Sequence, residues 1–172
     1  MKKFELVEPS LKYKKGFDLF HKNYKESGEH FVPFVLKFYE NNLEEYIALL
    51  KGFSKGVRVP DTFTEHSTFW LKDEDDNIKG VVNIRHRITD SLRRDGGLIG
   101  YGIAPMYRKQ GYATVMLKLA LQNAKQMGIN KALITCAKEN IGSAKVILNN
   151  NGILDSEEMI NSNMVQRYWV ET

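Results

Sequence analysis

The chain has 172 residues, 42% of them hydrophobic and 27% charged, a composition that predicts one folded domain over residues 1–172. The net charge of +4 is the difference between 25 basic and 21 acidic residues mixed along the chain, which argues against a nucleic-acid-binding surface. No apolar run is long enough to span a membrane or to act as a signal peptide. We therefore expect a cytoplasmic protein without membrane or nucleic-acid partners.

Hydrophobic periodicity and turn residues divide the chain into helices and strands. In chain order, the expected elements are a strand at residues 4–7, a helix at 10–26, a second helical region at 33–50, a loop at 52–65, a hairpin of strands 67–71 and 78–88, a strand at 98–104, a helix at 111–128, a strand at 131–137, a short helix opening at Asn140, and strands at 153–159 and 164–170. The pair Asn41-Asn42 could interrupt the second helical region.

The strand, helix and strand between residues 98 and 137 predict a parallel, right-handed βαβ unit. The last strand of this unit, residues 131–137, is almost continuously apolar, as in a strand buried on both faces. In the short helix that follows, the spacing predicts an inward face of four side chains: Ile141, Ala144, Ile147 and Leu148.

Residues 98–114, LIGYGIAPMYRKQGYAT, carry the clearest functional signal. A strand is closed by proline, and a short basic loop leads to a helix that opens at Gly111. The start of a helix has unpaired N–H groups and a positive dipole end, and glycine lets a ligand approach the backbone closely. Arg108 and Lys109 add positive charge, so we expect an anion site here, for a phosphate or pyrophosphate.

The six residues 108–113, RKQGYA, fit the R/Q-x-x-G-x-G/A motif, and in this setting the chain resembles the GCN5-related N-acetyltransferase (GNAT) superfamily. The order of elements over the whole chain is also similar. A bacterial subgroup of acetyltransferases without an assigned substrate shares runs like residues 66–70 (HSTFW), 82–87 (VNIRHR) and 100–103 (GYGI). The resemblance implies an α/β (α+β) fold with a central mixed, mostly antiparallel sheet of about six to seven strands and about four flanking helices.

The resemblance also implies that acetyl-CoA is the co-substrate, with its pyrophosphate on the backbone N–H groups of residues 108–113. Its pantetheine arm would run between the strands that end at Ile103 and near Cys136, which splay apart in this superfamily. The Ile103 N–H would polarise the thioester carbonyl. The residues then expected at acetyl-CoA are Ile103, Ala104, Arg108, Lys109, Gln110, Gly111, Tyr112, Ala113, Thr114, Asn140 and Ser143.

The chain departs from the family pattern at Ile147, where many members have a tyrosine that protonates the departing thiolate. The local phenols are Tyr101, Tyr107 and Tyr168, and the sequence does not choose among them. Tyr101 is kept as the candidate catalytic residue, and the alternative is that the thiolate leaves through water.

A general base for the amine is also expected. His86 is the candidate, because it falls inside a predicted strand on the face of Val82 and Ile84; the alternative is a hydrogen-bonded core histidine. His66 and Glu65 are weaker candidates, and Asp61 and Glu65 could instead hold a cationic acceptor. The opposite face of the same strand would carry Arg85 and Arg87 in solvent or in ion pairs.

The single cysteine, Cys136, excludes an intrachain disulfide and a cysteine-built zinc site, and its apolar surroundings indicate a buried hydrophobe rather than a nucleophile. The histidines have no ligand spacing, so no metal is expected. The predicted function is acetyl-CoA-dependent N-acetylation of a primary amine on a small molecule or peptide, by direct attack. The alternative is a non-catalytic acyl-CoA-binding module. We expect a monomer or a homodimer.

Overall fold

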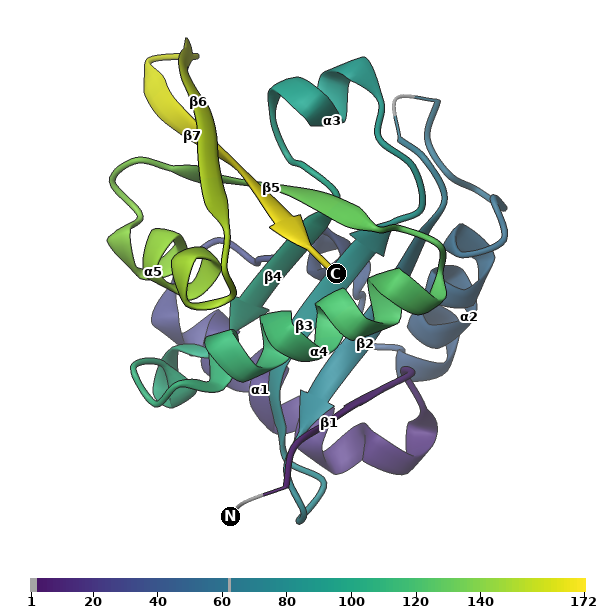
Figure 1. Cartoon of the computed structure of the whole chain (residues 1–172). Coiled ribbons are helices and arrows are strands. Elements are labelled where there is room, and N and C mark those ends of the chain that lie inside the picture. The colour runs from purple at the N-terminus through teal and green to yellow at the C-terminus, as the bar shows by residue number, and fades with distance from the viewer. Residues whose placement is uncertain (1–2, 62) are drawn as a thin grey trace.

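The computed structural model describes residues 3–61 and 63–172, and this part of the chain forms seven strands and five α-helices (Figure 1). The strands are β1 (Glu5–Val7), β2 (His66–Lys72), β3 (Ile78–Arg85), β4 (Ile99–Ile103), β5 (Lys131–Ala137), β6 (Ile153–Ile160) and β7 (Asn163–Glu171). The helices are α1 (Lys14–Ser27), α2 (Leu43–Phe53), α3 (Asp90–Arg94), α4 (Tyr112–Gln126) and α5 (Ile141–Asn149), with 3-10 turns η1 (Leu11–Tyr13), η2 (Phe34–Phe38) and η3 (Pro105–Tyr107).

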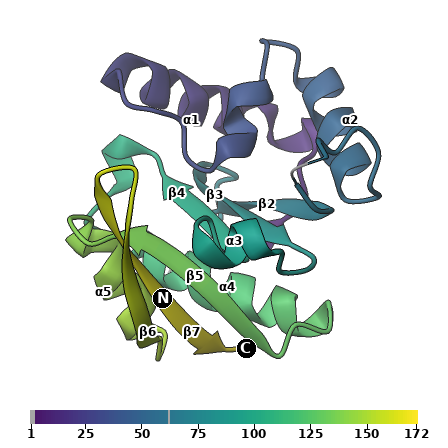
Figure 2. The same cartoon turned by 90° about the horizontal axis from the view of Figure 1, so that it is seen from above.

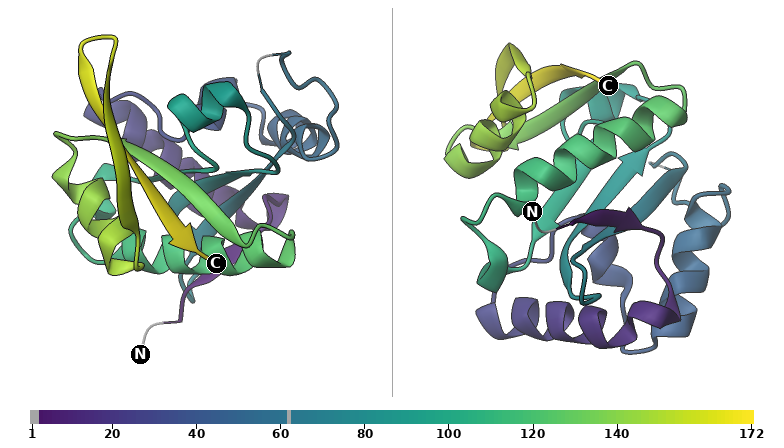
Figure 3. Two further views of the ribbon diagram at one scale, coloured as in Figure 1. Left: turned by 45° about the horizontal axis from the view of Figure 1, so that its top comes forward. Right: turned by 60° about the horizontal axis from the view of Figure 1, so that its bottom comes forward.

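Two antiparallel sheets make up the framework, one in the order β1-β2-β3-β4 and one in the order β5-β7-β6. Figure 2 shows α1 and α2 on one side of the first sheet, and α4 with the second sheet on the other. Because side chains alternate along each strand, the first sheet places apolar residues on both of its faces. Trp70 and Val81 pack into the aromatic core under α1 and α2, whereas Leu71 and Val82 pack under α4. Figure 3 shows α4 running across the strands of the first sheet.

The two sheets meet where β4 begins. The Leu98 N–H donates to the Leu133 carbonyl at 2.7 Å, and Gly97 makes this approach possible. Gly97 has φ +60°, and a β-carbon there would lie 2.5 Å from the Leu133 oxygen. The strand–helix–strand order expected between residues 98 and 137 is present as β4, α4 and β5. Its two strands do not form a continuous ladder: β4 is the edge strand of the first sheet, and β5 belongs to the second.

Most expected elements are present, with differences at their ends. The second helical region is broken at the asparagine pair, because Asn41 has φ +63° and the Asn42 side chain accepts a hydrogen bond from the Glu45 N–H as the N-cap of α2. Strand β3 ends at Arg85, one residue before His86. Helix α3 was not expected, since five residues are too few to show a period.

The inward face predicted for α5 is only partly correct. Ile147 is fully buried, but Ile141 and Leu148 are 64% and 52% exposed. This nine-residue helix packs on the core along a narrow strip around Ile147. No helix in the described residues is both long and apolar enough to cross a membrane.

Candidate functional site

The edge of β4 offers backbone hydrogen-bonding groups toward the second sheet. The Arg85 N–H donates to the Leu98 carbonyl and the Ala104 N–H to the Lys79 carbonyl, so β4 residues of even number pair with β3. In an antiparallel ladder the intervening residues point their N–H and C=O groups the other way. The peptide groups of Tyr101 and Ile103 therefore face the gap between the sheets, where an amide-bearing ligand could pair with them as an added strand would.

The loop after β4 ends in an open helix start. Lys109 and Gly111 have φ +60° and +83°, which turns the chain sharply into α4. Gly111 is the N-cap of α4 and contributes no side-chain hydrogen bond, and the first turn holds no acidic residue. A β-carbon at Gly111 would meet nothing within 4 Å. The first-turn N–H groups and the positive end of the helix dipole are therefore available to an anion.

The side chains of this loop contribute less charge than the sequence suggests. Arg108 turns back toward α1: its Nη1 lies 2.7 Å from Glu29 Oε2, and its Nε donates to the Ile103 carbonyl at 3.1 Å. Gln110 Nε2 donates to the Met106 carbonyl at 3.3 Å. Lys109 is exposed. An anion here would thus meet mainly backbone groups, with Lys109 as the nearby free cation of this loop.

The residues after Gly111 fasten the start of α4 to its neighbours. The Tyr112 ring packs edge-on against Phe4, with ring centroids 5.2 Å apart. The Thr114 carbonyl accepts a hydrogen bond from Asn150 Nδ2 at 3.2 Å. Ala113 lies between them, partly buried against the α4-side core. These contacts hold the first turn of α4 in place between β1 and α5.

The start of α5 lies beside the gap between the two sheets, next to Tyr101 of β4. The Asn140 side chain caps α5 by accepting a hydrogen bond from the Ser143 N–H at 3.0 Å. The Ser143 hydroxyl lies 2.9 Å from the Tyr101 phenol oxygen. Burial raises the pKa of Tyr101 to about 12 and also raises that of the neighbouring Cys136 thiol. The structure thus brings Tyr101, Asn140 and Ser143 together, with a phenol that is protonated at neutral pH.

His86 lies elsewhere. Its Nε2 is 2.8 Å from the Ser67 hydroxyl, and its N–H donates to the Glu65 carbonyl. Val82 is the residue of β3 that lies opposite Tyr101 in the ladder. His86 comes four residues after Val82, which corresponds to about 13 Å of extended strand. The structure therefore does not bring His86 next to Tyr101 and Ile103. Its role as the base stays a prediction.

The remaining candidates have ordinary surroundings. Glu65 accepts a hydrogen bond from the Thr64 hydroxyl and lies 3.5 Å from Arg87 Nε, while Asp61 is exposed. The Tyr168 phenol donates to Gln166, and the Lys79 ammonium lies 3.9 Å over the Tyr107 ring. Within residues 3–61 and 63–172, no three histidine, cysteine or acidic side chains come together as a metal site would require.

A cluster of three buried polar side chains was not expected from the sequence. His66, Asn83 and Arg85 lie side by side on the α1–α2 face of β2 and β3 and are 1%, 0% and 6% exposed. We call these three residues the buried polar cluster. The expected solvated position of Arg85 is wrong, because the Phe34 ring covers its guanidinium at 5.3 Å. The available signal was the alternation of Asn83 and Arg85 with apolar residues in β3.

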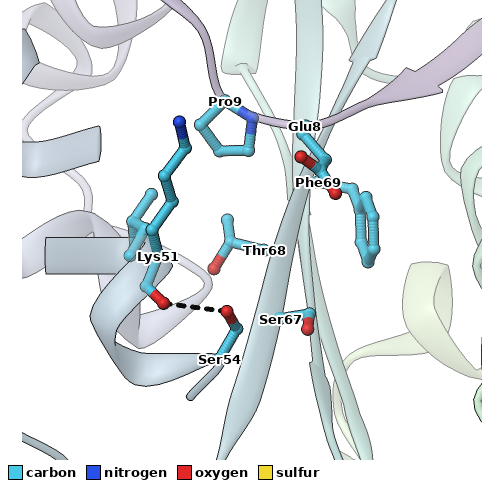
Figure 4. A pocket seen from close by; sticks show the side chains of 8 residues that line it. Glu8, Pro9, Lys51, Ser54, Ser67, Thr68 and Phe69 are labelled. Carbon is cyan, nitrogen blue, oxygen red and sulfur yellow. Dashed lines mark hydrogen bonds between the residues drawn. The ribbon is translucent and has the colours of Figure 1, made fainter. Parts of the chain in front are cut away.

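Two hollows lie near this framework. One of about 70 Å³ lies between the end of α2 and β2 (Figure 4), where Ser54 donates to the Lys51 carbonyl and Thr68 forms part of the wall. Its volume suits about two waters. The other, about 360 Å³, lies between α3 and the β6–β7 hairpin. There Arg94 and Arg167 both pair with Glu158, so neither arginine offers a free charge.

Comparisons with known proteins agree with this geometry. A family model described as an acetyltransferase (GNAT) domain matches residues 20–151. A Vibrio cholerae protein assigned as a ribosomal-protein-serine acetyltransferase is similar in structure over 100% of this chain and 95% of its own, with a TM-score of 0.66 at 13% identity. The microcin C7 self-immunity acetyltransferase MccE, solved with acetyl-CoA and AMP, is similar over 98% and 92%, with a TM-score of 0.65 at 17% identity.

A mutant form of the spermidine N-acetyltransferase SpeG from Vibrio cholerae is similar over 98% of this chain and 94% of its own, with a TM-score of 0.61 at 17% identity. At identities this low, the likeness to solved structures establishes the fold. No curated protein sequence matches the chain significantly.

Proposed function

The chain belongs to the GNAT acetyltransferase family, and we propose that it transfers the acetyl group of acetyl-CoA to a primary amine by direct attack. The observation that carries the proposal is the continuity of three features: the free edge of β4, the turn at Lys109 and Gly111, and the uncapped start of α4. A pantetheine arm suits the first, and a pyrophosphate suits the last. The known complex of MccE with acetyl-CoA supports the same ligand here.

In the proposed reaction, the lone pair of the neutral amine attacks the acetyl carbon and the carbon–sulfur bond breaks. The amine loses one proton, to water or to a general base, and the departing thiolate gains one. The Ile103 N–H would stabilise the negative charge that develops on the acetyl oxygen. Tyr101 would supply the proton, since its phenol is protonated and faces the start of α5. No acyl-enzyme is required, which agrees with the burial of Cys136.

Acetyl-CoA binding and turnover test the proposal separately. At one hundred times its Kd, acetyl-CoA should stabilise the fold by about 2.7 kcal/mol, which raises the Tm by roughly 5–10 °C for a chain of this size. A panel of diamines, amino acids and peptides with acetyl-CoA should then release free thiol. A Tm that does not move would contradict the proposed site. Stabilisation without thiol release would favour the non-catalytic binding module instead.

A further inference from the structure

Lys79 is a buried lysine whose position comes from a β-bulge. In the β2–β3 ladder Leu71 is paired with Gly80 and Lys72 with Ile78. Lys79 is therefore an extra residue of β3 without an opposite partner, and a bulge of this kind changes the direction of the bulged side chain. Lys79 is only 7% exposed, although lysine is almost never buried without a partner. The contacts of its ammonium group therefore need an explanation.

One partner of this ammonium group is a carboxylate in the turn between β2 and β3. Lys79 Nζ lies 2.8 Å from Asp73 Oδ2. The turn holds the carboxylate in place, because Asp73 Oδ1 accepts hydrogen bonds from the backbone N–H groups of Asp75 and Asn77. Burial alone would lower the pKa of Lys79, but the bond to Asp73 and the neighbouring Tyr107 raise it above its ordinary value. The ammonium group is therefore charged at neutral pH.

The other partners of the ammonium group are two aromatic rings in residues 104–112, which we call the β4–α4 segment. Lys79 Nζ lies 3.9 Å from the centre of the Tyr107 ring and 5.9 Å from the centre of the Tyr112 ring, within the range of a cation–π contact. Tyr107 ends η3, and Tyr112 is the first residue of α4. The two rings also contact each other edge-on, with centroids 6.2 Å apart. One buried charge therefore joins both ends of the turn into α4.

The backbone of Lys79 contacts the same segment directly after β4. The Ala104 N–H donates to the Lys79 carbonyl at 3.1 Å, so Lys79 contacts the β4–α4 segment at its beginning as well as near its end. Helix α1 provides a further contact, because the Met106 N–H donates to Asn23 Oδ1 at 3.0 Å. The segment is thus held between α1 and the bulge of β3.

The conformation of this segment needs such support. Lys109 has φ +60°, a conformation that costs energy in a residue with a β-carbon. The contacts of Lys79 lie on both sides of this residue, since Tyr107 comes two positions before it and Tyr112 three positions after it. They can therefore offset the cost of the turn that presents the first-turn N–H groups of α4.

We propose that Lys79 is a positioning residue for acetyl-CoA, which holds the β4–α4 segment in the conformation that binds the pyrophosphate. It would act through Tyr107 and Tyr112 and make no bond to the ligand itself. A segment that is already ordered loses less conformational entropy on binding, which raises the affinity. This inference rests on the proposed binding of acetyl-CoA at the start of α4.

Lys79→Met and Lys72→Met test this role as a matched pair. Lys72 is also largely buried, pairs with Asp76 of the same turn at 2.9 Å and lies 5.8 Å from the centre of the Tyr13 ring, away from the β4–α4 segment. We expect Lys79→Met to raise the Kd and the KM of acetyl-CoA about 5- to 30-fold, as for loss of a desolvated cation–π contact. The kcat at saturating acetyl-CoA should stay within about twofold. Lys72→Met should leave all three values unchanged.

Two further variants show whether the effect passes through the β4–α4 segment. Lys79→Arg keeps a cation beside the rings and should restore most of the affinity. Tyr107→Leu should weaken acetyl-CoA binding by itself, and adding Lys79→Met should then weaken it little further, because the two side chains act as one unit. Calorimetry gives the Kd values of the parent chain, the single variants and the double variant, and urea unfolding gives their stabilities.

Equal acetyl-CoA affinities of the parent chain and Lys79→Met would overturn the proposal, and so would equal losses in Lys79→Met and Lys72→Met. Additive losses from Lys79→Met and Tyr107→Leu would overturn it too, since they would show that the two residues act independently. If Lys79→Met does not fold, Tyr107→Leu decides, and an unchanged Kd in that variant contradicts the proposal. If the parent chain itself does not bind acetyl-CoA, it is the proposed function that fails.

Discussion

The two sides of the sheet at β4 present different kinds of polar group: main-chain groups on one side and side chains on the other. On the side of the second sheet, the candidate acetyl-CoA site consists of backbone groups of residues 101–113 and the start of α4. On the side of α1 and α2, the buried polar cluster consists of side chains from two strands, His66 on β2 with Asn83 and Arg85 on β3. The first offers main-chain groups that do not depend on which side chains are present, whereas the second depends on the identity of three side chains.

The largest expected effect would break the backbone side. Gly111→Asp adds a side chain and a negative charge beside the uncapped N–H groups, so acetyl-CoA affinity should fall more than 100-fold by calorimetry. Gly128→Asp is the matched control, because Gly128 follows the other end of α4 with φ +82° and equally open space. Equal affinities for the two folded variants would show that the anion does not bind at Gly111.

The next effect is the pH dependence of folding stability that comes from His66 in the buried polar cluster, and it can be measured without a ligand. His66 has a pKa of about 4 in the folded chain, against 6.5 ordinarily, so the unfolded chain binds more protons between these values. The stabilisation from neutral His66 is complete above pH 6.5 and is lost as the pH falls toward 4, by up to about 3 kcal/mol.

Urea unfolding at pH 7 and pH 4 checks this expectation. His66→Gln should remove that part of the acid destabilisation, whereas His30→Gln, at an exposed histidine, should keep it. The same pH dependence in both variants would show that His66 is not held neutral by its burial.

A smaller effect is expected at Tyr101, which lies beside the candidate acetyl-CoA site on the α4 side of the sheet. Tyr101→Phe removes the phenol that we assign to the leaving thiolate, so kcat should fall by about 10- to 100-fold at unchanged acetyl-CoA affinity. Ser143→Ala removes only the partner of the phenol and should lower kcat less. An unchanged kcat in Tyr101→Phe would assign the proton to another group or to water.

The smallest effect compares a buried arginine that has no acidic partner among the described residues with one that has such a partner. Arg85→Met should change the free energy of unfolding by less than about 1 kcal/mol, since relief of a buried unpaired charge offsets the lost bond to Gly96. Arg167 is equally buried but pairs with Glu158 and donates to the carbonyls of Arg93 and Arg94. Arg167→Met should therefore cost about 2–3 kcal/mol. Similar costs for both would show that removing the buried charge of Arg85 does not offset the lost bond.

The backbone side could be predicted from the sequence because its information is local. A strand, a proline, a positive-φ glycine and an apolar helix follow one another within residues 98–128, and each has its own signature. The helix cap at Asn140 and the helix break at Asn42 could also be predicted from the sequence, because a capping side chain bonds to a residue only three positions away.

The side-chain face could not be predicted, because it depends on contacts between distant segments. Alternation in β3 put Arg85 on one face and His86 on the other, but the pattern does not say that Phe34 from η2 covers Arg85. The single hydrogen bond that joins the two sheets, between Leu98 and Leu133, is a contact of the same kind. It depends on the space that Gly97 leaves beside a strand 35 residues further along the chain.

The open first turn of α4 has a consequence for sequence divergence. A peptide N–H is the same whichever side chain follows it, so substitutions along residues 108–113 leave the first-turn N–H groups of α4 in place as long as Gly111 keeps its turn. Such a site constrains conformation rather than composition. The fold tolerates the same divergence, because structures that share only 13–17% of their residues with this chain are similar to it over nearly its whole length.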